Sequence, residues 1–138
     1  MSRQLKHTVM FVDDELINLL LFEKRFEVDF KILTASSGKE ALGKLEIHVH
    51  ELEVIISDMR MPSMSGLEFI KTARKRFTGI RYFILTGYSY DKELENALQD
   101  QVIERLLKKP YDYETIKDAV VRYDNPKISI SNKTDANI

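Results

Sequence analysis

Five short apolar runs recur along this chain of 138 residues, and each is followed by a stretch with helical character. The runs are rich in Val, Ile, Leu and Phe, and they do not alternate cleanly between apolar and polar residues. Such runs are typical of strands that are covered on both faces. They span residues 8–12, 31–34, 54–57, 82–86 and 105–107.

The stretches between the runs have the spacing of amphipathic helices. Residues 16–26 are apolar over a broad arc, which suits a helix packed on a sheet. Ser37, with Glu40 three residues later, resembles a capping box at the start of another helix. Apolar residues at helical spacing mark three further helices: Leu67, Ile70, Ala73 and Phe77; Leu94, Ala97 and Leu98; Ile116, Ala119, Val120 and Tyr123.

Strands that alternate with helices predict βαβ units, with right-handed crossovers and a parallel sheet. Five repeats predict a doubly wound α/β fold, a five-stranded parallel sheet with helices on both faces. Asn125 and Pro126 end the last helix, so we expect one domain over residues 1–124 and a polar tail over 125–138. A weak alternation at 127–131 leaves open a short edge strand there.

Composition excludes several classes of function. A net charge of −1 does not favour nucleic-acid binding, and no apolar run is long enough to cross a membrane. The N-terminus leads straight into the first apolar run, without the apolar region of a signal peptide. The chain has no cysteine, which rules out disulfides and thiolate metal sites and fits a reducing compartment. We therefore expect a cytoplasmic protein that binds neither membranes nor nucleic acid directly.

Polar side chains gather where the predicted strands end. The first strand leads into Asp13 and Asp14, the third into Asp58, the fourth ends at Thr86 and the fifth leads into Lys109. In open α/β sheets, functional groups collect outside the carboxyl ends of the strands. The sequence thus predicts three carboxylates, one hydroxyl and one ammonium on a single rim.

Three neighbouring carboxylates repel one another unless one is protonated or a cation joins them. Magnesium fits best, because Mg2+ takes hard oxygen ligands and keeps several waters. Imidazole ligands are not expected, since His7, His48 and His50 lie away from this rim. A carboxylate beside Mg2+ can act as a nucleophile towards phosphorus. The Thr86 hydroxyl and the Lys109 ammonium would then neutralise phosphoryl oxygens.

Simpler interpretations exist for single residues. Asp14 could cap the first helix, and Lys109 could be an ordinary ion-pair partner. The occurrence of the whole set at successive strand ends favours the functional interpretation.

Four segments of the chain resemble the receiver domain of two-component response regulators. They are VMFVDDE at 9–15, ISDMRMPSMSGLE at 56–68, FILTG at 83–87 and KKPY at 108–111. The resemblance extends over residues 8–123, and it implies a flavodoxin-like strand order of 2-1-3-4-5.

The resemblance also implies roles for the acidic residues. Asp58 would be the phosphoacceptor. Asp14 would bind Mg2+ directly, Asp13 would act partly through water, and Arg60 would offer its backbone carbonyl to the metal. The protein would then be a phosphoacceptor signalling switch, not an enzyme acting on other substrates. It would catalyse only its own phosphorylation and dephosphorylation.

Partners and the remaining pocket residues follow from the same resemblance. Thr86 and Lys109 would hold the phosphoryl oxygens, and Pro110 often follows the lysine through a cis peptide bond. The phosphodonor would be a phosphohistidine on a sensor histidine kinase or a histidine phosphotransfer protein. Output would pass to a downstream protein target or to an output domain missing from this chain. The signalling face would be made by the fourth helix, fifth strand and fifth helix, with candidate residues Asp91, Lys92, Glu95, Arg105 and Lys117.

One position departs from the family pattern. Many receivers carry an aromatic switch residue three positions before the conserved lysine, where this chain has Leu106. We expect Thr86 to move towards the phosphoryl group, with Tyr88 and Tyr90 as substitute mobile aromatics, although ordinary loop aromatics are an equal alternative. Arg60 and Tyr88 are also placed where family members tune dephosphorylation.

Three other functions stay open at this point. A haloacid-dehalogenase-type phosphatase also uses an Asp nucleophile with magnesium, but its pattern needs a second Asp where this chain has Arg60. A flavin-binding module would need a phosphate loop after the first strand, where Asp13, Asp14 and Glu15 would repel a phosphate. The third is a degenerate receiver that only binds partners.

Overall fold

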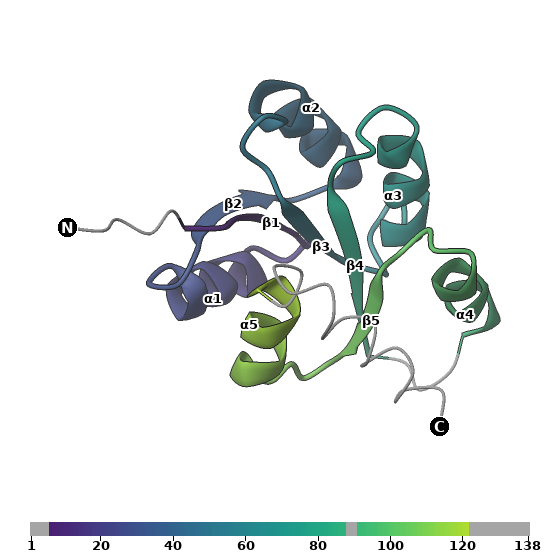
Figure 1. Ribbon diagram of the computed structural model, residues 1–138. Coiled ribbons are helices and arrows are strands. Elements are labelled where there is room, and N and C mark those ends of the chain that lie inside the picture. Colours follow the sequence, from purple (N-terminus) through teal and green to yellow (C-terminus); the bar gives the residue numbers. More distant parts are fainter. Residues whose placement is uncertain (1–5, 88–90, 122–138) are drawn as a thin grey trace.

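The computed structural model of the protein describes residues 6–87 and 91–121. Within these ranges, five strands alternate with five helices along the chain (Figure 1). The elements are β1 (Thr8–Val12), α1 (Leu16–Phe26), β2 (Lys31–Ala35), α2 (Gly38–His48), β3 (Val54–Asp58), α3 (Gly66–Arg74), β4 (Arg81–Thr86), α4 (Lys92–Gln99), β5 (Arg105–Lys108) and α5 (Tyr113–Val121).

The strands form one parallel sheet in the order β2-β1-β3-β4-β5. The predicted α/β fold with flavodoxin-like strand order is therefore confirmed. β1 lies between β2 and β3, so the order reverses beside β1, and Val12 pairs with Ser57 in the register. Asp13, which follows β1, and Asp58, the last residue of β3, are thereby brought to the same edge of the sheet.

Both faces of the sheet are covered by helices, with α1 and α5 on one side and α2 and α3 on the other (Figure 1). Met10, Ile55 and Ile84 point into one apolar cluster, whereas Phe11 and Phe83 point into a second. Phe11 stacks on Phe22 of α1, with ring centroids 4.1 Å apart. Burial of alternate side chains on opposite faces explains why the strands lack a polar face.

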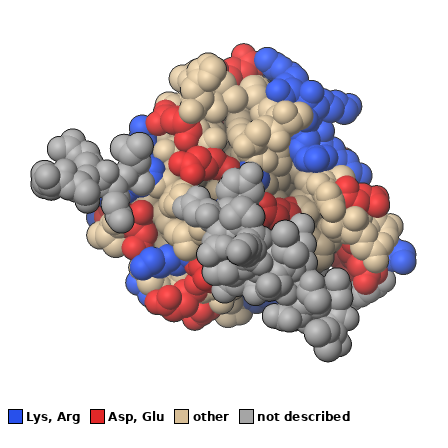
Figure 2. All heavy atoms as spheres, in the orientation of Figure 1, with Lys and Arg blue, Asp and Glu red and all other residues tan. Residues whose placement is uncertain are grey.

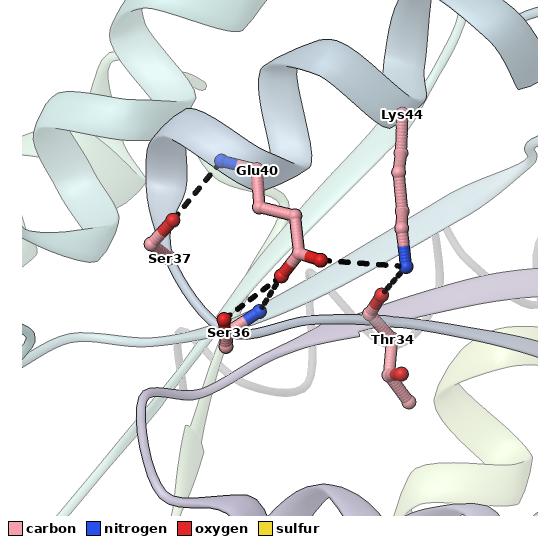
Figure 3. Close-up of polar contacts among 5 residues, drawn as sticks. All are labelled: Thr34, Ser36, Ser37, Glu40 and Lys44. Carbon is pink, nitrogen blue, oxygen red and sulfur yellow. Dashed lines mark hydrogen bonds and ion pairs between the residues drawn. The ribbon is translucent and has the colours of Figure 1, made fainter.

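The caps of α2 and α3 differ. At α3, Ser65 and Glu68 form a complete capping box, with each side chain bonded to the other's backbone N–H. At α2, the Ser37 hydroxyl accepts from the Glu40 N–H at 3.0 Å, as the sequence predicts. The Glu40 carboxylate instead binds the N–H and the hydroxyl of Ser36, and it lies 3.8 Å from the Lys44 ammonium (Figure 3).

Several predicted boundaries shift by a residue or more. β2, β3 and β5 extend one residue further than expected, and β4 begins one residue earlier. Helix α3 ends at Arg74, before Phe77, although Phe77 is buried in the core. Tyr123, the predicted tail over 125–138 and its possible edge strand lie outside the described residues. The boundary between domain and tail therefore stays a prediction.

On the face in Figure 2, Lys and Arg atoms gather at the upper right, over the region of α3. The last turn of α3 carries Lys71 and Arg74, where cations complement the negative end of the helix dipole. Among the described helices, none has the length and apolar character needed to span a membrane.

Candidate functional site

Three aspartates meet at the carboxyl edge of the sheet. Asp13, Asp14 and Asp58 each place a carboxylate oxygen within 4.8 Å of the other two. Asp13 and Asp58 are buried, with 1% and 7% of their surfaces exposed, whereas Asp14 is exposed. The predicted grouping of carboxylates at this rim is therefore present. The set consists of oxygen ligands only, which suits a hard cation such as Mg2+.

Lys109 and Thr86 lie on the same rim. The Lys109 Nζ lies 2.9 Å from the Asp58 Oδ1, and the Lys109 N–H donates to the Thr86 carbonyl at 2.8 Å. Thr86 is buried at the end of β4. The peptide bond between Lys109 and Pro110 is cis, as the resemblance implies.

A cavity of about 470 Å3 opens over these groups. It is lined by Asp14, Glu15, Asn18, Asp58, Arg60, Thr86, Gly87 and Lys109. Its lining therefore combines acidic residues with two basic residues, Arg60 and Lys109, and includes the last residues of β3 and β4, Asp58 and Thr86. Such a cavity can hold a small, highly charged group together with a cation.

The charges in the pocket shift the pKa values of two groups. Burial raises the pKa of Asp13, and the negative charge of Asp58 raises it further, against lowering by the Glu15 N–H and Lys109. Burial alone lowers the pKa of Lys109. The hydrogen bond to Asp58 and the charges of Asp58 and Asp13 outweigh burial, so the pKa of Lys109 is raised overall. The pocket thus holds closely spaced negative charge that one ammonium partly offsets.

Asp14 does not cap the first helix. The N-cap residue of α1 is Glu15, whose side chain makes no capping bond. The Asp13 Oδ1 instead accepts the Glu15 N–H at 2.9 Å. The simpler interpretation of Asp14 as a helix cap is therefore wrong, and its carboxylate lines the cavity.

The loop after β3 folds back tightly against Asp58. The Ser57 hydroxyl donates to the Asp58 carbonyl at 2.8 Å, and the Gly66 N–H donates to the Met59 carbonyl at 2.8 Å. A Cβ atom at Gly66 would lie only 2.1 Å from the Asp58 carbonyl oxygen. Glycine is thus required at position 66, because any side chain would push the backbone that carries Asp58.

Sequence reasoning did not assign three residues that line the cavity, Glu15, Asn18 and Gly87, to the site. A signal was available for Asn18, since it lies three residues after the N-cap residue Glu15, and side chains at that spacing can bond back to the start of a helix. Leu106 lies on β5, partly buried against the core. Tyr88 and Tyr90, the proposed substitute aromatics, lie outside the described residues.

Comparison with known proteins gives a consistent result. The family model for the response regulator receiver domain matches residues 9–121. Sporulation initiation phosphotransferase F of Bacillus subtilis is 30% identical over 119 residues, which cover 83% of this chain and 91% of that protein. Among solved structures, the chemotaxis protein CheY4 of Vibrio cholerae is 27% identical, with a TM-score of 0.75 over 85% of this chain and 98% of that one.

Longer relatives also match. The hydrogenase transcriptional regulatory protein HoxA of Cupriavidus necator is 30% identical over 113 residues, or 82% of this chain. The chain spans only 23% of that relative's length. The match therefore gives no information about the function of the rest of that relative.

Proposed function

The chain belongs to the response regulator receiver family, whose members act in phosphorelay signalling, and from this premise we propose that Asp58 is its phosphoacceptor. One observation carries the proposal. The Asp58 carboxylate lies at the floor of an open cavity, 2.9 Å from the Lys109 ammonium and within 4.8 Å of two further aspartates. A carboxylate in such a place is accessible to a phosphodonor. The negative charge that develops on the phosphoryl group during transfer can be neutralised by the neighbouring ammonium.

The reaction would transfer a phosphoryl group from nitrogen to oxygen. An Asp58 carboxylate oxygen attacks the phosphorus of a phosphohistidine, the phosphorus–nitrogen bond breaks, and the imidazole leaves with its electron pair. The products are an aspartyl phosphate and a histidine. The Lys109 ammonium and the Thr86 hydroxyl would bind equatorial phosphoryl oxygens, where negative charge is spread in the transition state.

Asp13, Asp14, Asp58 and the Arg60 backbone carbonyl would hold Mg2+ at this rim. The all-oxygen donor set supports this assignment. When bound, Mg2+ supplies positive charge that offsets the carboxylates and the phosphoryl group. Catalysis would be limited to the protein's own phosphorylation and dephosphorylation.

The phosphodonor would dock on the exposed face of α1. Four large apolar side chains of this helix are exposed: Leu16 (68%), Ile17 (58%), Leu20 (48%) and Leu21 (56%). The helix begins directly after Glu15, and its first turn supplies Asn18 to the cavity wall. A protein that brings a phosphohistidine to Asp58 must approach this opening, and the adjacent apolar face would bury against it.

Output would pass through the α4–β5–α5 face to a target protein or an output domain. Asp91, Lys92, Glu95 and Arg105 are candidates on this face. Lys117 instead pairs with Asp29, which follows α1, at 3.5 Å. It therefore points towards the α1 side of the molecule, and we do not include it among the output residues. Leu106 occupies the position of the aromatic switch, so ring rotation there would not be the output.

Phosphorylation by acetyl phosphate tests the proposal directly. The full chain, incubated with acetyl phosphate and Mg2+, is expected to gain the mass of one phosphoryl group, and a chelator is expected to prevent the gain. Asp58→Asn should abolish it, while Asp100→Asn, the same change on an exposed residue beyond α4, should not. Equal labelling of the Asp58→Asn variant would exclude Asp58 as the acceptor. No labelling of wild type would instead favour a receiver that only binds partners.

A further inference from the structure

Asn18 connects two carboxylates at the mouth of the pocket. Its Nδ2 donates to the Asp13 Oδ2 at 3.2 Å and to the Glu15 Oε1 at 3.1 Å. Ionised carboxylates only accept hydrogen bonds, so the amide nitrogen, and not the amide oxygen, must face them. Both N–H bonds of the amide are thereby used, and Asn18 bridges the two acidic side chains.

The bridge completes the support of Asp13. The Asp13 Oδ1 accepts the Glu15 N–H at 2.9 Å, and its Oδ2 accepts from Asn18. Each oxygen of this buried carboxylate is thus held by a donor from the start of α1. Two bonds to two different oxygens fix the plane of a carboxylate, which one bond cannot do.

The hydrogen bonds of Asn18 oppose the repulsion among the acidic groups. Asp13, Asp14 and Asp58 lie close together, and Glu15 adds a fourth carboxylate at the cavity wall. Without a cation, like charges favour spreading these side chains apart. A neutral amide holds two of them without adding a positive charge, so it does not compete with a cation for the carboxylates. The Lys109 ammonium, in contrast, places a positive charge beside Asp58.

From this geometry we infer that Asn18 is a positioning residue of the cation site, which orders Asp13 and Glu15 before the cation binds. The inference rests on the proposed Mg2+ site. Groups that orient metal ligands typically change metal affinity 10- to 100-fold when they are removed. Asn18 touches the proposed ligand Asp13 and not the reacting atoms, so its effect is on cation binding first.

A purely local role is the competing explanation. Asn18 lies three residues after the N-cap Glu15, where a side-chain bond back to the cap can stabilise a helix start. In that case the loss of Asn18 would change folding stability and leave the Mg2+ affinity of the folded protein unchanged. The bond to Asp13, which lies outside the helix, argues for the positioning role.

The test is a Mg2+ titration of the full chain without a phosphodonor, followed by amide NMR shifts. Asn18→Ala and Asn18→Leu both remove the donor but differ in size, so an equal loss in both assigns the effect to the hydrogen bonds. Each is expected to raise the Mg2+ dissociation constant about tenfold. Asn96→Ala is the matched control, because it makes the same change on an exposed position of α4.

The outcomes separate the inference from its premise. If wild type titrates and both Asn18 variants bind Mg2+ as tightly, Asn18 has no positioning role and the cation site stands. If wild type shows no Mg2+-dependent shifts, the proposed cation site itself is wrong, and the inference falls with it. Dispersed amide spectra of the variants without Mg2+ check that each one is folded.

Discussion

The Lys109 ammonium lies 2.9 Å from the Asp58 Oδ1, so the two groups form an ion pair across the floor of the cavity. Asp58 is almost fully buried, whereas 34% of the Lys109 side chain is exposed. This pairing holds the ammonium beside the carboxylate that would attack phosphorus. The same ammonium can then reach a phosphoryl oxygen attached to Asp58 with little movement.

Lys109→Met is expected to slow phosphorylation of Asp58 by acetyl phosphate about 100-fold, since loss of one charge-stabilising donor typically costs 100- to 1,000-fold. Lys108→Met is the matched control, because Lys108 is the preceding residue and is exposed. The rates can be followed by intact mass at fixed Mg2+. Equal rates for the two variants would show that Lys109 is only an ion-pair partner of Asp58.

Gly66→Ala is expected to damage both fold and site. The new Cβ would lie 2.1 Å from the Asp58 carbonyl oxygen and 2.9 Å from the Ser57 hydroxyl, so the backbone must shift. Overpacking of this kind costs about 1–3 kcal/mol of unfolding free energy. The shift should also slow phosphorylation, because it moves Asp58.

Gly43→Ala provides the opposite control. Gly43 lies within α2, and a Cβ there meets nothing within 4 Å. Replacing glycine by alanine inside a helix should stabilise the protein by about 1 kcal/mol. Urea unfolding of both variants decides the matter, and a Gly66→Ala protein as stable as wild type would contradict the close approach.

The fold class and the grouping of the pocket residues could be predicted from the sequence, because both depend on simple patterns. Apolar runs separated by helical stretches specify a covered parallel sheet. The carboxyl ends of parallel strands share one edge, so residues such as Asp13, Asp58 and Lys109 had to meet there. The strand order itself does not follow from these patterns, since alternation alone allows several orders, and it came from the family resemblance.

Finer features depend on geometry that spacing does not encode. The Glu40 carboxylate turns to Ser36, although the spacing to Ser37 predicts a reciprocal cap. Phe77 has helical spacing from Ala73 but lies past the end of α3, and its carbonyl accepts from the Tyr82 hydroxyl. Asn18 was missed because its role depends on which way an amide on the first turn of α1 points.

Tyr82→Phe tests a pH-dependent contribution to stability. The Tyr82 hydroxyl is buried and donates to the Phe77 carbonyl at 2.7 Å. Burial raises the pKa of Tyr82 to about 12, although the charge of Arg74 opposes this. At pH 8, the variant should lose about 1 kcal/mol of unfolding free energy, because one buried hydrogen bond is removed.

The sign of the pH dependence follows from the raised pKa. An unfolded tyrosine loses its proton near pH 10, whereas Tyr82 in the folded protein keeps it to about pH 12. Its stabilising contribution is therefore complete below about pH 10 and is lost as the pH rises towards 12. Urea unfolding of both proteins from pH 8 to 11.5 should show their stability difference shrinking above pH 10. A constant difference would contradict the raised pKa.

Leu21→Glu tests the proposed docking face of α1. Leu21 is 56% exposed, so a charge there should be tolerated by the fold but should disfavour burial against a partner. We expect phosphotransfer from a cognate phosphohistidine protein to slow about tenfold, which corresponds to about 1.4 kcal/mol of interface free energy. Phosphorylation by acetyl phosphate should be unchanged, because that small donor needs only the cavity.

Ile47→Glu is the control for this change, since Ile47 is 75% exposed on α2 and lies outside the proposed face. The two donors separate docking from chemistry. Slowing with both donors would mean that Leu21→Glu disturbs the Asp58 pocket, and equal slowing by Ile47→Glu would point to a general effect of added charge. Only slowing that is specific to Leu21→Glu and to the protein donor supports α1 as the surface that receives the phosphodonor.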